Sequence, residues 1–138
     1  MPILNQPDEL RALLEGARVI AVVGHSPDPA RASYRIARFM RRMGYTVYAV
    51  NPTVEQIDGE PSYPDLASVP EPIDIVNVFR RSEHLPGVVA DAIAVGAGAV
   101  WAQLGVRSAE AARLADEAGL PLVQNRCIKV DYARLVRR

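Results

Sequence analysis

Apolar residues are concentrated in five short runs along the chain, and these runs predict β-strands. Each run is mainly apolar, without regular alternation of apolar and polar positions, and is bounded by glycine, proline or polar residues. Such runs are typical of strands that are buried on both faces of a sheet. The predicted strands span residues 18–23, 46–50, 73–79, 99–104 and 122–124.

Between these runs the apolar positions recur every three or four residues, which is the helical period. In one segment they are Tyr34, Ile36, Ala37, Met40 and Met43. The first predicted helix begins within residues 5–9 and ends at about residue 15. The others span residues 33–43, 82–95, 108–118 and 130–136. Serines at 33, 82 and 108 are candidate caps. Five prolines in residues 52–72 predict a long connection that contains one helical turn at 64–68.

Predicted strands and helices alternate along the whole chain. This alternation, with strands buried on both faces, indicates an α/β fold in which helices cover both faces of a mainly parallel five-stranded sheet. Right-handed crossovers make such a sheet doubly wound. The length of 138 residues fits one domain, over residues 1–138.

Composition and charge narrow the functional classes. The 16 basic and 16 acidic residues cancel, so we expect no nucleic-acid or membrane partner. The single cysteine, Cys127, excludes an internal disulfide, and no apolar segment suits a signal peptide or a membrane span. We therefore expect a soluble cytoplasmic protein with a small-molecule ligand, and self-association into a homo-oligomer stays open.

The segments that follow the five strands are polar, glycine-bearing or cationic. Ligands of open α/β sheets bind at these carboxyl ends, so the segments predict one crevice for an anionic ligand. The strand-end segments are Gly24-His25-Ser26, Asn51-Pro52, Phe79-Arg80-Arg81-Ser82, Gln103-Leu104-Gly105 and Gln124-Asn125-Arg126-Cys127.

The first of these loops has the composition of a phosphate site. Gly24 allows a sharp turn and the close approach of a ligand, so a side chain there is expected to block binding without disrupting the fold. Free N–H groups at the start of the next helix suit a phosphate, and Arg31 and Ser26 can contribute a charge and a hydroxyl. Ser33 fits two roles equally well, a phosphate contact or a helix cap.

A dinucleotide site is disfavoured by two features. The pattern G-x-G-x-x-G needs three glycines, and this loop has only Gly24. In a dinucleotide site the second strand also ends in Asp or Glu, which binds the ribose hydroxyls. Here Asn51-Pro52 occupies that place. A nucleotide with a phosphorylated ribose, which a carboxylate would repel, or a ligand placed differently would fit Asn51 better.

Other chemistry has less support in the sequence. His25, His84 and Cys127 have no metal-ligand spacing, Asp28 and Asp131 stand alone, and we expect no metal site and no catalytic residue. Trp101 is expected in the core. Two interpretations of Cys127 stay open: a small buried hydrophobe, or a thiol beside cations that favour the thiolate.

Five ordered motifs, VVGHSPDPARASYRIARFM, GYTVYAVNP, DIVNVFRRSE, VWAQLGV and EAGLPLVQNRCIKVD, resemble one family. They are similar to the small stand-alone CoA-binding proteins, which are related to the CoA-binding domain of the succinyl-CoA synthetase α subunit. The resemblance implies a Rossmann-like fold and coenzyme A at the strand ends. The residues that it implies for coenzyme A are Gly24, His25, Ser26, Arg31, Ala32, Ser33, Tyr34, Asn51, Pro52, Phe79, Arg80, Gln103, Gly105, Asn125, Arg126 and Cys127.

Three functional hypotheses follow from the sequence. The first is non-catalytic binding of coenzyme A or a short acyl-CoA, because the resemblance does not bring the other domains that ligase activity needs. The second is an enzyme that uses coenzyme A, or a redox protein that forms a mixed disulfide with coenzyme A through Cys127. The third, an NAD-type redox sensor, is disfavoured by the glycine count and by Asn51.

Overall fold

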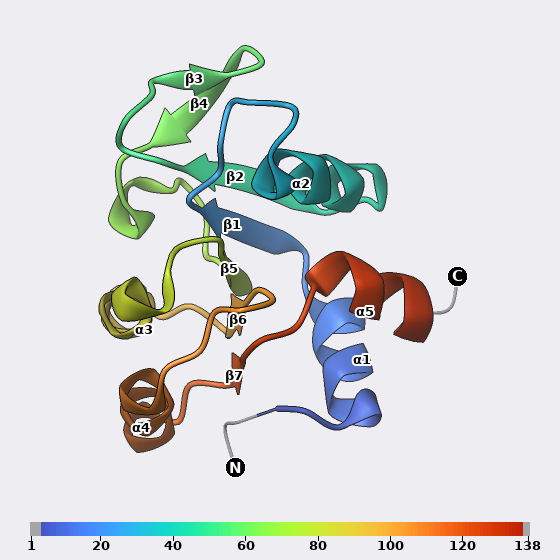
Figure 1. Cartoon of the computed structure of the whole chain (residues 1–138), viewed down its shortest axis with the longest axis vertical. Coiled ribbons are helices and arrows are strands. Elements are labelled where there is room, and N and C mark those ends of the chain that lie inside the picture. Colours follow the sequence, from blue (N-terminus) through green and yellow to red (C-terminus); the bar gives the residue numbers. More distant parts are fainter. Residues whose placement is uncertain (1–3, 137–138) are drawn as a thin grey trace.

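The computed structural model describes residues 4–136, which form an α/β fold around one seven-stranded sheet. The strand order is β3-β4-β2-β1-β5-β6-β7, and every neighbouring pair is parallel except β3 and β4 (Figure 1). The strands are β1 (Val19–Val23), β2 (Thr46–Val50), β3 (Gln56–Ile57), β4 (Glu60–Tyr63), β5 (Ile75–Val78), β6 (Val100–Ala102) and β7 (Leu122–Val123).

Helices cover both faces of the sheet, as the apolar runs predict. One face carries α1, α2 and α5, and the other carries α3 and α4 (Figure 1). The helices are α1 (Pro7–Gly16), α2 (Ala32–Arg42), α3 (Leu85–Val95), α4 (Ala109–Ala118) and α5 (Ile128–Leu135), with short 3-10 helices η1 (Leu66–Ser68) and η2 (Ser82–His84). Among residues 4–136, no helix is long and apolar enough to cross a bilayer.

Each central strand contributes to two hydrophobic cores, one on each face. In β1, Ala21 and Val23 pack toward α3 and α4, while Ile20 and Val22 pack toward α1, α2 and α5. This explains why the strands are mainly apolar. Trp101 is fully buried among the residues of the second core, which confirms the expectation for this residue.

The sheet has two strands more than predicted, and both lie in the segment that was expected to be a connection. The helical turn predicted there exists as η1, but β3 and β4 precede it as an antiparallel hairpin. Asp58 and Gly59 form the two-residue turn, and both have a positive φ, 52° and 82°. Such a turn is a recognised hairpin signal. Short edge strands tolerate prolines such as Pro61, so the prolines did not exclude them.

Two of the three candidate serine caps, Ser33 and Ser82, do not cap a helix. Helix α2 begins at Ala32, so Ser33 lies inside its first turn, and its Oγ accepts a hydrogen bond from the Ser26 N–H at 2.9 Å. Ser82 instead links the loop after β5 to the loop after β6. Its Oγ accepts from the Arg107 N–H and donates to the Gly105 carbonyl. Ser108 does cap α4, accepting from the Ala111 N–H at 3.1 Å.

The outermost strands of the sheet, β3 and β7, each contain only two residues. Beyond β7, the Leu4 N–H donates a hydrogen bond to the Leu122 carbonyl at 2.8 Å. The N-terminal segment therefore lies beside the last strand before it enters α1.

Candidate functional site

The carboxyl ends of the parallel strands meet at one edge of the sheet, and the predicted segments follow them there. Going outward from β1, the chain places β2 on one side and β5, β6 and β7 on the other. The direction of winding thus reverses next to β1, which is where doubly wound sheets bind ligands. Gly24 follows β1 and Phe79 follows β5, so both residues flank this point.

A hollow that we name the main cleft opens between these strand ends, η1 and α3. It has a volume of about 440 Å³. Five predicted residues line it, together with two carboxylates, Asp65 and Asp91, that the sequence did not single out. The predicted lining residues are Gly24, Asn51, Pro52, Phe79 and Arg80. The Asp65 Oδ1 accepts from the Ser68 N–H and Oγ, so Asp65 also caps η1.

A second hollow, the loop hollow, lies where the loop after β1 enters α2. Its volume is about 290 Å³, and all six of its lining residues were predicted: Gly24, Ser26, Arg31, Ala32, Ser33 and Phe79. The Arg31 side chain makes no cap bond to α2, so the first N–H groups of α2 have no side-chain acceptor at the N-cap position. Unpaired N–H groups at the start of a helix attract phosphate.

Side-chain hydrogen bonds hold this loop in shape. The Ser26 Oγ accepts from the Asp28 N–H at 3.0 Å, and the Asp28 Oδ1 accepts from the Ala30 N–H at 2.9 Å. From β2, the Asn51 Nδ2 donates to the His25 carbonyl at 2.9 Å, while its Oδ1 accepts from Thr53. Asn51 therefore supports the loop with both ends of its amide, in addition to lining the main cleft.

At Gly24, after β1, the backbone leaves no room for a side chain beside the end of β5. The φ of Gly24 is +86°, and an added Cβ would lie 2.7 Å from the Phe79 carbonyl oxygen. The obstacle to a side chain at this position is thus the protein's own backbone, in contrast to the sequence-based expectation of a clash with ligand alone. Because Gly24 and Phe79 line both the main cleft and the loop hollow, the two hollows meet here.

The His25 side chain is buried beneath the loop and lines neither hollow. Its Nδ1 lies 2.9 Å from the Ser26 carbonyl oxygen, its Nε2 lies 3.4 Å from the Arg41 Nη1, and its ring meets the edge of Tyr34. Burial lowers the pKa of His25 and the Arg41 charge adds to this effect, against the Ser26 carbonyl contact, which raises the pKa. The His25 ring is therefore not placed to contact a ligand in either hollow.

Folding stability should fall as the pH drops below about 6.5, the ordinary pKa of histidine. The unfolded chain then binds a proton at His25 that the folded protein resists, because the folded pKa is lowered, so stability falls by at most about 1.4 kcal/mol per pH unit until the folded group titrates. Urea unfolding at several pH values would measure this slope. The slope should flatten in His25→Gln and persist in His84→Gln, which alters an exposed histidine. An equal slope in His25→Gln would contradict the assignment.

Tyr34 links α2 to the β3–β4 hairpin. Its hydroxyl donates a hydrogen bond to the Asp58 carboxylate in the hairpin turn, and this bond raises the pKa of Tyr34. The predicted contact of Tyr34 with a ligand therefore competes with an existing partner. Tyr34 does not line either hollow at the β1 end.

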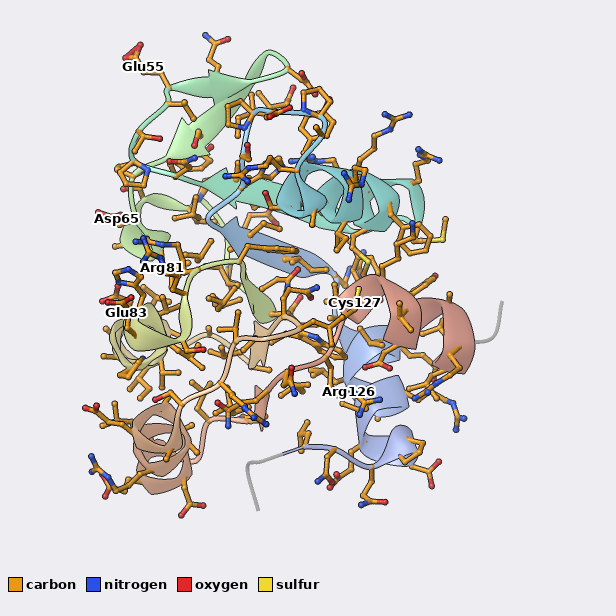
Figure 2. All side chains as sticks on the ribbon, in the orientation of Figure 1. Glu55, Asp65, Arg81, Glu83, Arg126 and Cys127 are labelled. Carbon is orange, nitrogen blue, oxygen red and sulfur yellow. The ribbon has the colours of Figure 1, made fainter. Side chains whose placement is uncertain are left out.

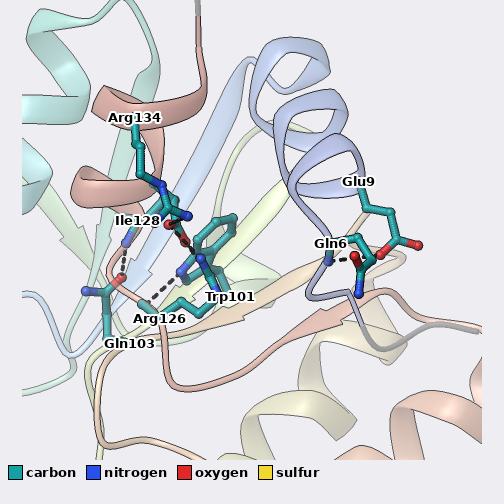
Figure 3. A network of polar contacts seen from close by, with 8 residues as sticks. Gln6, Glu9, Trp101, Gln103, Arg126, Ile128 and Arg134 are labelled. Atoms are coloured by element: carbon teal, nitrogen blue, oxygen red, sulfur yellow. Dashed lines mark hydrogen bonds and ion pairs between the residues drawn. The ribbon is translucent and has the colours of Figure 1, made fainter.

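At the other end of the edge, the β6 and β7 loops are tied to the start of α5. The buried Gln103 Oε1 accepts from the Ile128 N–H and the Asn77 Nδ2, both at 3.0 Å. The Asn125 Oδ1 accepts from the Gly105 N–H at 2.7 Å. The Trp101 Nε1 donates to the Arg126 carbonyl at 2.9 Å (Figure 3). These predicted residues thus share in building the loops.

Arg126 is not the free cation that the sequence suggested, and Asp131 is not isolated. The Arg126 guanidinium donates to both oxygens of the buried Asp131 carboxylate, at 2.6 and 2.9 Å. This hydrogen-bonded pair raises the pKa of Arg126. Arg134 makes a longer contact with Asp131 at 3.4 Å. The Arg126 charge is therefore largely balanced within the protein.

A third hollow, the α5 hollow, lies between these loops and α5, with a volume of about 250 Å³. Its lining includes the predicted Asn125, Arg126 and Cys127, and also Leu104 and Val130. Cys127 is half-buried at the N-cap of α5, on the opposite side of the sheet from Asp65 (Figure 2). Lys129 follows Cys127 by two residues, and its Nζ lies 5.2 Å from the centre of the Phe39 ring.

Most of the predicted residues thus fall into two groups, one around Gly24 and one around Cys127. Residues of the first group line the loop hollow and the main cleft, and residues of the second group line the α5 hollow. Four predicted residues, His25, Tyr34, Gln103 and Gly105, line none of these hollows. Among residues 4–136, no cluster of three or more histidine, cysteine or acidic side chains could hold a metal ion.

Comparisons with known proteins match nearly the whole chain. The sequence profile of a family described as CoA binding domain matches residues 18–133. The uncharacterized protein YneT of Bacillus subtilis is 40% identical over 125 residues, which cover 91% of this chain and 93% of YneT. The structure of a hypothetical protein from Pyrococcus horikoshii has 36% identity and a TM-score of 0.91, over 95% of this chain and 92% of that one.

A larger protein contains a related segment. The ADP-forming acetate–CoA ligase I of Archaeoglobus fulgidus is 29% identical over 123 residues. These residues cover 80% of this chain but only 18% of the ligase. The similarity is therefore confined to one part of that enzyme.

Proposed function

The chain belongs to the family of CoA-binding domains, and from this membership we propose that it binds coenzyme A, or a short acyl-CoA, reversibly and without catalysis. The observation that carries the proposal is the junction at Gly24, where the loop hollow at the start of α2 meets the main cleft. A nucleotide carrier with several phosphates needs both an anion site and a neighbouring cleft for its base. The two hollows provide these at the point where winding reverses.

The loop hollow suits the pyrophosphate of the carrier. The first N–H groups of α2 and the positive end of its dipole face this side, and Arg31 at the N-cap adds a formal charge. The Ser26 and Ser33 hydroxyls already accept from backbone N–H groups, so they fix the loop and can donate their own protons to phosphate oxygens.

The main cleft suits the adenosine part. Its apolar walls include Val50, Leu66 and Val88, which can contact the faces of a base. Asp65 and Asp91 offer acceptors for an adenine amine or a ribose hydroxyl, while Arg80 offers a charge for a ribose phosphate. After β2, the neutral Asn51 amide occupies the position where NAD-type sites have a carboxylate that binds the ribose hydroxyls.

We assign no catalytic residue. The hydroxyls of Ser26 and Ser33 are held by backbone N–H groups, and the His25 ring contacts a carbonyl and Arg41, not a hydroxyl. A general base needs hydrogen-bond reach to the proton that it abstracts. The arrangement therefore supports binding, and the ligand's own chemistry would be carried out elsewhere.

Thermal unfolding with coenzyme A, acetyl-CoA, dephospho-CoA, NAD and ATP tests the proposal. A ligand that binds the native state stabilises it by about 2.7 kcal/mol at a hundred times its Kd. Coenzyme A should raise Tm the most, dephospho-CoA less because it lacks the ribose phosphate, and NAD little. A larger shift with NAD than with coenzyme A, or no shift with any CoA form, would reject the proposal.

Replacing Cys127 with serine should change the affinity for coenzyme A by less than about tenfold, or roughly 1.4 kcal/mol. The reason is that Cys127 lies outside the loop hollow and the main cleft, which are proposed to hold the phosphates and the adenosine. Calorimetry under reducing conditions measures the affinity. A much larger loss, or a reductant-labile adduct of coenzyme A mass on the wild-type protein alone, would instead favour the mixed-disulfide hypothesis.

A further inference from the structure

The α5 hollow is lined by two exposed aliphatic side chains, Leu104 and Val130. Leu104 is 66% exposed and Val130 is 56% exposed, the highest values among the large hydrophobic residues of the described chain. Both line the same hollow, although they are 26 positions apart in sequence. A single exposed leucine is ordinary, but two aliphatic side chains that face one concave space are typical of a ligand site.

The hollow is held in a fixed shape by hydrogen bonds beneath it. Gln103, next to Leu104, binds the Ile128 N–H at 3.0 Å, which fixes the β6 loop to the helix that carries Val130. The Arg126 carbonyl accepts from the buried Trp101 ring (Figure 3). The lining also contains three charged residues: Arg126 and Asp131 form a bidentate pair, and Arg134 contacts Asp131 at 3.4 Å. A preformed site of this kind binds without a large ordering cost.

The position of the hollow relates it to the proposed phosphate site. Its loops follow β6 and β7, and β7 lies three strand spacings from β1, about 14 Å along the same edge. Helices α2 and α5 pack on the same face of the sheet, in one hydrophobic core. A carrier held by its phosphates at the start of α2 can therefore run along this edge toward α5, over a distance comparable to an extended pantetheine arm.

We propose that the α5 hollow receives the aliphatic acyl group of an acyl-CoA, with Leu104 and Val130 as its apolar walls. The inference rests on the proposed function and specifies its ligand class. The volume of 250 Å³ corresponds to roughly eight water-sized groups of about 30 Å³ each, which is room for an acyl chain of several carbons. The protein then discriminates thioesters by chain length, favouring butyryl over acetyl.

The test is calorimetric titration of coenzyme A, acetyl-CoA and butyryl-CoA into the full chain. Each buried methylene should improve affinity about fourfold. Butyryl-CoA, with two methylenes more, should therefore bind at least about tenfold more tightly than acetyl-CoA. The Leu104→Ser/Val130→Ser variant should reduce this ratio to within about twofold. Ile93→Ser, which alters an exposed aliphatic residue of α3 outside the hollow, is the matched control and should keep the full ratio.

The outcomes separate this inference from the proposed function. Binding of coenzyme A with equal affinity for acetyl-CoA and butyryl-CoA would overturn the acyl site alone. A chain-length preference that survives unchanged in the Leu104→Ser/Val130→Ser variant would also overturn it, because the preference would then arise elsewhere. Failure of every CoA form to bind would overturn both the acyl site and the proposed function.

Discussion

Replacing Gly24 with valine is expected to weaken coenzyme A binding at least a hundredfold, or about 2.7 kcal/mol. The φ of +86° is unfavourable for any residue with a Cβ, at a cost of about 1–2 kcal/mol. The Cβ would also lie 2.7 Å from the Phe79 carbonyl oxygen, so the end of β5 must move. Because Gly24 and Phe79 line both the loop hollow and the main cleft, this movement deforms both halves of the proposed site.

Calorimetry on the folded variant measures this effect, with circular dichroism to confirm that the sheet is retained. Gly24→Ala is the milder companion variant if valine prevents folding. Gly44→Ala is the matched control, because Gly44 also has a positive φ, 103°, but nothing lies within 4 Å of its added Cβ. The control should lose some stability and keep its affinity. A folded Gly24→Val protein with wild-type affinity would contradict the site.

Replacing Asp131 with alanine is expected to lower the free energy of unfolding by about 2–3 kcal/mol. The Asp131 carboxylate is buried, and its removal leaves the Arg126 guanidinium, which is 29% exposed, without its bidentate partner. Breaking a buried pair by removing one member is strongly destabilising because it leaves a charge in a poorly solvated place. Partial solvation of Arg126 keeps the expected loss at the lower end of the usual range. Urea denaturation measures it.

The Asp8–Arg11 pair provides a matched control for this prediction. It is also an aspartate–arginine contact, at 3.2 Å, but Asp8 is 94% exposed. Asp8→Ala should therefore change stability by less than about 0.5 kcal/mol. The double variant Arg126→Met/Asp131→Leu should recover most of the loss, since apolar side chains of similar size often replace a buried pair without cost. Equal losses for Asp131→Ala and Asp8→Ala would contradict the importance of burial.

The central strands of the fold could be predicted because strands that are buried on both faces consist mainly of apolar residues. Residues 46–50 were predicted and observed as β2, and the predicted strand at 18–23 differs from β1 by one residue. The hairpin could not be inferred from apolar runs, because β3 and β4 contain few apolar residues and include Pro61. The Asp58-Gly59 pair was the available signal, and the neighbouring prolines obscured it.

The candidate site was predictable where the backbone determines it, and less so where side-chain direction matters. Gly24 and the start of α2 follow from the strand–turn–helix pattern, and these residues do share a hollow. His25 follows Gly24 in the chain, yet its ring turns under the loop against Arg41, which no local pattern specifies. The Arg126–Asp131 pair depends on α5 beginning at Ile128, two residues before the predicted start.

The two-residue strands at the borders of the sheet have a consequence for behaviour at high concentration. Unpaired backbone groups on a long border strand can recruit another molecule and seed aggregation. Here β3 and β7 offer very few such groups, and the Leu4 N–H already occupies the Leu122 carbonyl beside β7. Intermolecular growth of the sheet is therefore disfavoured at both borders.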